Sequence, residues 1–192
     1  MKPTQLMLFV IALLMSSVSN TAVAQRSPIA KGDEALHVNV PDVDVYDQNG
    51  KRLKFYTDLV KGKTVAINVI FTTCTNICPP LTATFRKVQM EADPNVNLIS
   101  ISVDPTTDTP ERLKAYADKF KAGPGWTFVT GDKQAIDKLL AGLGAAVADK
   151  NDHTPMVLIG NESANYWTRA YGLSPPTRLA GAIKTATEQK AP

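Results

Sequence analysis

The sequence predicts an α/β fold in which buried strands alternate with helices, and two observations carry this prediction. Segments 64–71 and 96–103 are rich in β-branched and apolar residues at successive positions, which is typical of strands buried on both faces. Each is followed by a segment with the apolar spacing of a helix, 81–92 after the first and 110–120 after the second. No internal repeat or low-complexity tract divides the 192 residues, so one globular domain is expected.

A β-hairpin is predicted before the first buried strand. Asn49-Gly50 is the strongest short hairpin signal, and apolar residues alternate on either side of it. We therefore expect hairpin strands at 43–46 and 53–55, with a turn at 61–63 leading into the buried strand.

The two central helices have recognisable faces and starts. The first is expected to present four apolar side chains to the core, Leu81, Phe85, Val88 and Met90. Pro79 and Pro80 can occupy its first turn, where a missing amide donor costs little. The second helix has Asp108 or Thr109 as its cap and begins at Pro110.

The remaining elements complete the order of a thioredoxin-like domain. They are a strand at 126–129, a helix at 133–143, strands at 156–160 and 166–171, and a closing helix from 176 to about 190. A strand–helix–strand–helix succession that ends in a hairpin and a final helix is the order of that fold. The N-terminal hairpin and the inserted strand–helix element at 126–143 are additions to it.

The first 24 residues are interpreted as a secretory signal peptide. Lys2 is followed by an apolar run at 6–15, and Ala22-Val23-Ala24 has the small-x-small pattern of a cleavage site. The run is about ten residues long, whereas a membrane-spanning helix needs roughly 20. We expect cleavage near Ala24, a single domain over 25–192 and a periplasmic location, and the alternative is an uncleaved N-terminal anchor.

Charge and composition argue against nucleic-acid binding. The formal net charge is +3, and the lysines and arginines are scattered singly through the chain. A nucleic-acid footprint would gather them on one face or along one helix. The slightly basic balance is therefore that of an ordinary solvated surface.

The only two cysteines, Cys74 and Cys78, are candidates for local chemistry. A disulfide that closes so short a loop restrains the unfolded chain little, so a purely structural pair is the weaker interpretation. They follow a central strand and precede a helix, whose positive N-terminal end favours a thiolate over a thiol. Because Pro79 biases Cys78 away from helical geometry, we expect an irregular loop in which both thiols can react.

His153 is the candidate partner of the cysteine pair. It lies in Asp152-His153-Thr154-Pro155, immediately before the final hairpin, and in a thioredoxin-like sheet this loop faces the active cysteines. Thr154-Pro155 has the position of that fold's cis-proline. Two thiolates and one imidazole suit copper, with soft sulfur favouring Cu(I), whereas structural zinc needs four ligands. A hydrogen-bonded loop histidine is the alternative, and His37 is expected to be structural or exposed.

Three motifs together resemble the Sco/SenC family from about residue 35 to the last helix. They are the strand 65–71 leading into the segment 74–79, Ser102-Val103-Asp104-Pro105 with Asp108-Thr109-Pro110, and Asp152-His153-Thr154. The resemblance implies that Cys74, Cys78 and His153 bind one copper ion, as Cu(I) or Cu(II). It also implies help in metallating the CuA centre of cytochrome c oxidase. Asp104 and Asp108 are expected to be turn and helix-cap residues.

The resemblance also suggests partners and an alternative function. The expected partner is the oxidase subunit that carries the CuA site, with periplasmic copper carriers or thiol reductants as further candidates. We expect a monomer with at most peripheral membrane association. Since some family members reduce the cysteines of their target, a thiol–disulfide oxidoreductase in which copper is incidental is the alternative. A peroxidase is disfavoured, because the usual Pro-x3-Thr-x2-Cys approach to a peroxidatic cysteine is absent.

Overall fold

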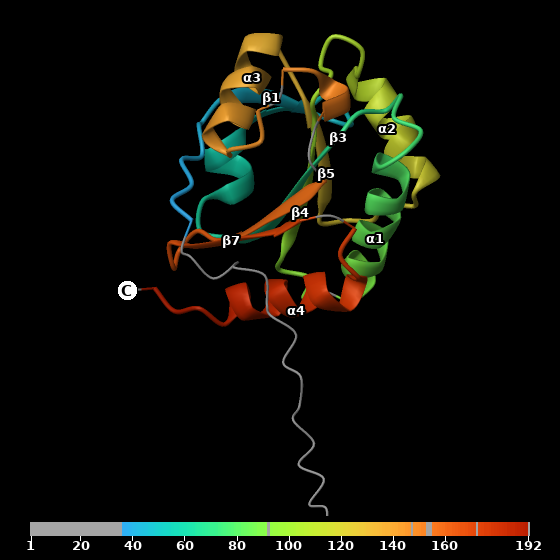
Figure 1. The fold of residues 1–192 in the computed structure, drawn as a ribbon. Helices are drawn as coiled ribbons and strands as arrows, with labels where there is room; N and C mark the ends of the chain where they lie inside the picture. Colours follow the sequence, from blue (N-terminus) through green and yellow to red (C-terminus); the bar gives the residue numbers. More distant parts are fainter. Residues whose placement is uncertain (1–35, 92, 147, 153–154, 172, 192) are drawn as a thin grey trace, which may run out of the picture. The chain divides into compact units, whose positions relative to one another are not determined.

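The described part of the chain is built on one mixed sheet, whose seven strands lie in the order β2-β1-β5-β4-β3-β6-β7 (Figure 1). This computed structural model describes residues 36–91, 93–146, 148–152, 155–171 and 173–191, all within the compact unit Lys31–Pro192. The strands are β1 (Asp44–Asp47), β2 (Arg52–Lys54), β3 (Thr64–Ile70), β4 (Asn97–Ser102), β5 (Trp126–Thr130), β6 (Met156–Asn161) and β7 (Tyr166–Tyr171). The expected signal peptide lies outside the described residues.

Helices cover both faces of the sheet. The described helical elements are η1 (Phe55–Val60, a π-helical turn), α1 (Cys78–Glu91), α2 (Pro110–Lys119), α3 (Lys133–Gly142), η2 (Lys150–Asp152, a 3-10 turn) and α4 (Pro176–Thr187). The core under α1, α2 and α4 is one apolar cluster, and the core under η1, α3 and the segment before β1 is a second. Figure 1 shows α1 and α2 together on one side and α3 on the other.

The strand directions bring three loops to one edge of the sheet. β3 pairs with β4 in parallel and β4 pairs with β5 in parallel, so their carboxyl ends lie at the same edge. β6 runs antiparallel to β3, with Val157 opposite Asn68, which brings the amino end of β6 to that edge as well. The loops after β3, after β4 and before β6 therefore meet there, and this edge is called the carboxyl edge below.

The expected thioredoxin-like order is confirmed, including the N-terminal hairpin and the inserted strand–helix element β5–α3. β1 and β2 pair antiparallel around Gly50, whose φ of +78° is a conformation that glycine adopts without strain. Phe55 was expected to end the second hairpin strand, but it begins η1 instead. Asp42 accepts hydrogen bonds from the amides of Tyr56 and Thr57 and so favours the turn over a longer strand.

The structure confirms one expectation for α1 and contradicts two. Pro79 and Pro80 lie in its first turn, as expected, but the helix already includes Cys78, which was expected to avoid helical geometry. Met90 was assigned to the core but is 71% exposed. Phe85 and Val88 share the buried face, and a residue two positions after Val88 is rotated by about 200° from it on a helix of 3.6 residues per turn.

Candidate functional site

The cysteine pair lies at the carboxyl edge, between β3 and α1. Cys74 is in the loop after β3, where its amide donates to the Phe71 carbonyl at 3.1 Å. Cys78 is the first residue of α1 and its amide donates to Cys74 Sγ at 3.3 Å. Both are free thiols, with Cys74 half-buried and Cys78 completely buried. The expectation that both thiols are open is therefore wrong for Cys78.

Cys74 caps the start of α1, and this changes its acidity. Burial raises the pKa of the Cys74 thiol, but a hydrogen bond from the Cys78 side chain and backbone hydrogen bonds from Cys78, Asn76 and Ile77 outweigh it. The net result is a Cys74 pKa below the usual value of a thiol. The sulfur thus accepts the amide donors that a helix start leaves unpaired, and these donors favour the thiolate.

Cys78 has the opposite acidity. The pKa of its thiol is raised to about 12, chiefly by burial, with contributions from the hydrogen bond to Cys74 and from the charges of Cys74 and Asp108. A thiol with so high a pKa is protonated near neutral pH and is therefore a poor nucleophile until a metal ion or a bond to another sulfur takes the place of its proton. The pair therefore combines one accessible, acidic sulfur with one buried, protonated sulfur.

Asp108 anchors the start of the cysteine loop. It is fully buried and accepts hydrogen bonds from the Thr72 amide at 3.1 Å, the Thr72 hydroxyl at 2.5 Å and the Ser102 hydroxyl at 2.7 Å. The cap of α2 is Thr109, which accepts from the Arg112 amide, so the expectation of Asp108 as a cap residue is wrong. Its position just before a helix made a cap the simpler interpretation, because neither Thr72 nor Ser102 is its neighbour in sequence.

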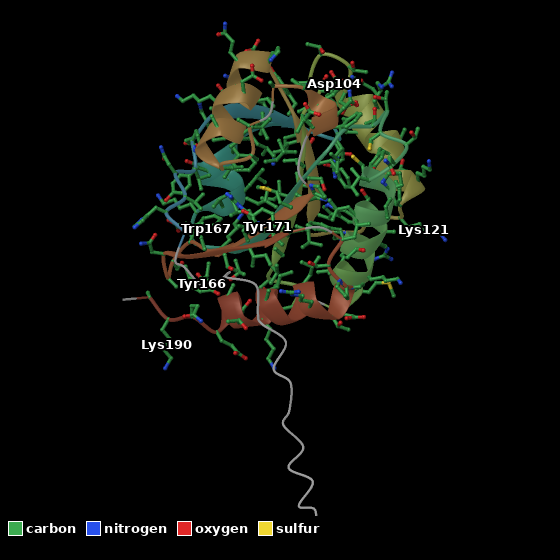
Figure 2. The ribbon with its side chains drawn as sticks, viewed as in Figure 1. Asp104, Lys121, Tyr166, Trp167, Tyr171 and Lys190 are labelled. Carbon is green, nitrogen blue, oxygen red and sulfur yellow. The ribbon has the colours of Figure 1, made fainter. Side chains whose placement is uncertain are left out.

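Asp104 closes the turn after β4, as expected, and also binds a lysine that the sequence analysis missed. Its carbonyl accepts from the amides of Thr107 and Asp108. Its carboxylate forms an ion pair with Lys150 of η2 at 2.6 Å. Figure 2 shows Asp104 at the upper end of the view, where the carboxyl edge lies. Burial raises the pKa of the Asp104 carboxyl, but hydrogen bonds from Lys150, Thr107 and Thr106 outweigh this and keep it below its usual value.

Of the other candidate ligands considered in the sequence, the structure describes His37 and Met156 but not His153. His153 and Thr154 lie outside the described residues, so the third ligand and the cis-proline geometry of Thr154-Pro155 stay predictions. His37 is exposed in the segment before β1, as expected. Met156 is buried in the core and not a ligand candidate. Within the described residues, no group of three or more His, Cys, Asp or Glu side chains is arranged to hold a metal ion.

Comparison with known proteins identifies the family. The family model described as SCO1/SenC matches residues 38–188. The chain belongs to the SCO1/SenC family. An SCO1 protein homolog of Bacillus subtilis (strain 168) is 33% identical over 106 residues, which are 53% of this chain and 54% of that relative. The chain thus spans about half the length of the curated relatives that it matches first.

Solved SCO1/SenC structures share the fold over most of the chain. BsSco, described as a member of the Sco family of cytochrome c oxidase assembly proteins, has a TM-score of 0.68 and 26% identity, covering 82% of this chain and 98% of that one. Copper-bound ScoI of Bradyrhizobium japonicum has a TM-score of 0.60 and 28% identity, covering 78% and 99%. The resemblance seen in the sequence is confirmed, and copper is bound by a member of the family.

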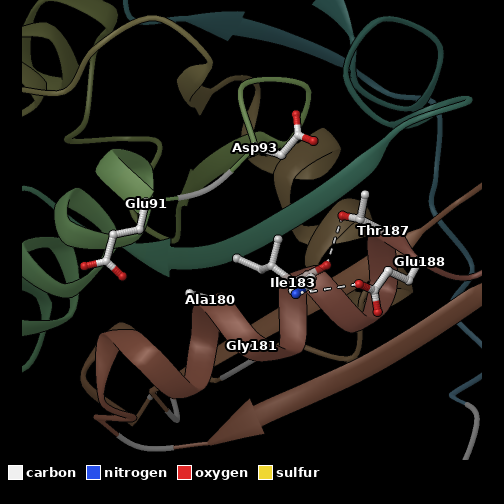
Figure 3. A pocket seen from close by; sticks show the side chains of 8 residues that line it. Glu91, Asp93, Ala180, Gly181, Ile183, Thr187 and Glu188 are labelled. Atoms are coloured by element: carbon white, nitrogen blue, oxygen red, sulfur yellow. Dashed lines mark hydrogen bonds and ion pairs between the residues drawn. The ribbon is translucent and has the colours of Figure 1, made fainter.

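One depression of this SCO1/SenC chain lies at the opposite end of α1 from Cys78. It lies between the end of α1 and α4 and is lined by Glu91, Asp93, Ala180, Gly181, Ile183, Lys184, Thr187 and Glu188 (Figure 3). None of these residues carries a sulfur or an imidazole. In the described residues, no helix is both long enough and apolar enough to cross a bilayer.

Proposed function

We propose that this chain is an exported copper chaperone, which binds one copper ion through Cys74, Cys78 and His153 and delivers it to the CuA site of cytochrome c oxidase. One observation carries the proposal: two reduced cysteines with unlike acidity share a hydrogen bond at the start of α1, in a family with a copper-bound member. Thiolate sulfur is the soft donor that selects Cu(I), and imidazole suits both oxidation states of copper.

The chain path supports His153 as the third ligand. Lys150 of η2 pairs with Asp104 after β4, and Met156 begins β6 beside the end of β3. Segment 153–154 is therefore flanked in the chain by residues at the carboxyl edge on both sides.

The chemistry of uptake follows from the two thiols. Binding of Cu(I) by both sulfurs displaces the proton of the Cys78 thiol and any proton left on Cys74, so metal uptake releases protons to solvent. Cys74, being half-exposed and acidic, is the sulfur that meets the metal first. Release to a partner is then a ligand exchange, in which an incoming thiolate or imidazole replaces the chain's own donors one at a time.

The test is metal stoichiometry with the second histidine as a matched control. Wild-type protein is expected to hold one copper per chain, and Cys74→Ser or Cys78→Ser to lose it. His153→Ala is expected to lower Cu(II) affinity and to alter the sulfur-to-copper charge-transfer band, whereas His37→Ala changes neither. A His153→Ala protein that binds both oxidation states with wild-type affinity would overturn the three-ligand site.

A thiol–disulfide oxidoreductase is the second candidate, favoured by the unequal cysteines. Cys74 as a thiolate attacks a partner's disulfide, forming a mixed disulfide and releasing one partner sulfur as a thiolate that takes up a proton. Cys78 then loses its proton and attacks Cys74 Sγ, which frees the second partner thiol and leaves a Cys74–Cys78 disulfide. The partner gains two electrons and the chain loses them. A Cys78→Ser trap that accumulates mixed disulfides with an oxidase subunit, equally with and without copper, favours this function.

Location and assembly belong to the same proposal. We expect the first 24 residues to be removed on export, and the mature chain to be a monomer with at most peripheral membrane contact that meets the oxidase subunit carrying the CuA site. N-terminal sequencing of the protein from the periplasmic fraction is expected to start near Gln25. Recovery of the intact chain in the membrane fraction would indicate an uncleaved anchor instead.

A further inference from the structure

One ion pair joins the loop before β6 to the loop after β4. Lys150 Nζ lies 2.6 Å from Asp104 Oδ2, with side-chain exposures of 37% and 9%. The same Nζ lies 5.4 Å from the centroid of the Phe71 ring, at the end of β3. The lysine thus contacts both loops that border the cysteine site, from a position three residues before His153.

Asp104 is itself held by a chain of hydrogen bonds that leads to the cysteine loop. Its amide donates to Ser102 Oγ at 3.0 Å, and Ser102 Oγ donates to Asp108 Oδ2 at 2.7 Å. Asp108 in turn accepts from the amide and hydroxyl of Thr72, two residues before Cys74. A continuous polar connection therefore runs from Lys150 to Thr72, and is called the polar clasp below.

We propose that the polar clasp positions the segment that carries His153 relative to the cysteine pair. Lys150 and Asp104 are positioning residues, since they act on the site through the chain segments that they hold. The inference rests on the proposed function in one respect, the role of His153 as a copper ligand. Its mechanical part, the restraint of residues 149–152, stands independently of copper.

The burial of Asp104 makes this ion pair different from those on the surface. Exposed ion pairs contribute little because water screens them and their long side chains lose entropy on pairing. Here Asp104 is buried, so removal of the lysine leaves a desolvated carboxylate short of a donor. The loop responds by moving, which exposes the carboxylate to water and releases η2 from the carboxyl edge.

The experiment compares Lys150→Met with Lys133→Met. Lys133 pairs with Asp137 on α3 at the same 2.6 Å, but with side-chain exposures of 63% and 55%. In the copper-free protein, the amides of Asn151 and Asp152 donate to Asp149 Oδ1 at 2.8 Å and to the Asp149 carbonyl at 3.0 Å. Hydrogen exchange at these two amides is expected to quicken about tenfold in Lys150→Met. Lys133→Met is expected to leave both amides unchanged. Unchanged exchange in Lys150→Met overturns the proposal whatever the metal data show.

The copper measurements test the link to His153. Lys150→Met and Asp104→Asn are each expected to weaken Cu(II) binding about tenfold and Cu(I) binding less than threefold, because two sulfurs suffice for Cu(I). Lys150→Arg, which keeps the cation, is expected to stay within twofold of wild type. Thermal unfolding checks that each variant is folded. Asp104→Asn changes the carboxylate of the ion pair, whereas Lys150→Met changes its cation, so the two variants test the same contact independently.

A double-mutant cycle separates the two proposals. If the clasp acts through His153, Lys150→Met has no further effect on Cu(II) affinity in the His153→Ala background. A full tenfold effect in that background overturns the positioning role while leaving the copper site intact. Wild-type protein that binds no copper, or a His153→Ala protein with unchanged affinity, would instead overturn the proposed function. In that case the hydrogen-exchange measurement still tests whether the polar clasp restrains residues 149–152.

Discussion

The carboxyl edge and the depression between the end of α1 and α4, called the groove below, are both candidates for a functional region. They differ in how strongly their polar side chains are held by hydrogen bonds. At the edge, Asp108 is fully buried and Asp104 nearly so, and both belong to one connected set of hydrogen bonds. In the groove, Glu188 faces Lys184 at 3.9 Å with side-chain exposures of 65% and 78% (Figure 3). A depression shows only that there is space for a ligand. Buried polar groups that hydrogen-bond to one another hold the side chains of a site in a fixed geometry, and binding a metal or reacting with a substrate requires such a fixed geometry.

The largest expected effect is on stability at the carboxyl edge. Asp108→Ala leaves the Thr72 amide and the Thr72 and Ser102 hydroxyls without their acceptor, which is expected to lower the free energy of unfolding by about 3 kcal/mol. Asp93→Ala in the groove removes bonds only to exposed Asn95 groups and is expected to cost no more than about 1 kcal/mol. Urea unfolding measures both, and equal losses would remove the distinction between the two regions.

Within the edge, the two thiols are expected to differ in reactivity by at least about a hundredfold at pH 8. Cys74, with its pKa lowered, is alkylated as the thiolate, and its rate falls only as pH drops through that pKa. Cys78, with its pKa near 12 and its sulfur buried, reacts slowly, and its rate rises with pH throughout the range below 12. Mass spectrometry of peptides from briefly alkylated, reduced protein distinguishes them. Comparable labelling of both would contradict the asymmetry.

A smaller effect is expected behind the cysteines. Thr82 Oγ1 donates to the Cys78 carbonyl at 2.8 Å and lies 2.8 Å from the hydroxyl of Tyr116, which is nearly buried. Tyr116→Phe removes that second contact while keeping the ring packed, and is expected to cost about 1 kcal/mol. The midpoint of thermal unfolding provides the measurement. No change at all would show that this contact does not support the start of α1.

The smallest effect is expected in the groove itself. Lys184→Ala removes a long, solvent-exposed ion pair and is expected to change the free energy of unfolding by less than about 0.5 kcal/mol. Copper stoichiometry is expected to stay at one per chain in the same variant. A Lys184→Ala protein that lost copper would move the functional region from the edge to the groove.

Local signals in the sequence predicted most of the fold. Runs of apolar residues, as in Val65–Ile70, predict the buried strands, and Asn49-Gly50 predicts the hairpin. The start of α1 was predicted wrongly because the rule that a residue before proline avoids helical geometry considers only neighbours in the sequence. In the folded chain Cys74 Sγ accepts the Cys78 amide, and this contact stabilises helical geometry at Cys78 despite Pro79.

The sequence predicted only those parts of the candidate site that are close together along the chain. Cys74 and Cys78 are four residues apart and directly follow a strand, so they could be found without coordinates. The roles of Asp108 and Lys150 depend on side chains brought together from 36 and 46 positions away, respectively, which no periodicity encodes. His153 stays a prediction, drawn from the expected fold and from the family resemblance.

If the chain carries copper as proposed, the unequal burial of the two sulfurs has a consequence for the direction of metal transfer. A copper ion held between them would be shielded by the protein on the Cys78 side and more open to solvent on the Cys74 side. An acceptor protein would approach from the more open side, so the bond to Cys74 would be exchanged early and the bond to Cys78 late. The buried sulfur would thus retain the cargo until the acceptor already holds it, which limits the loss of free copper during the exchange.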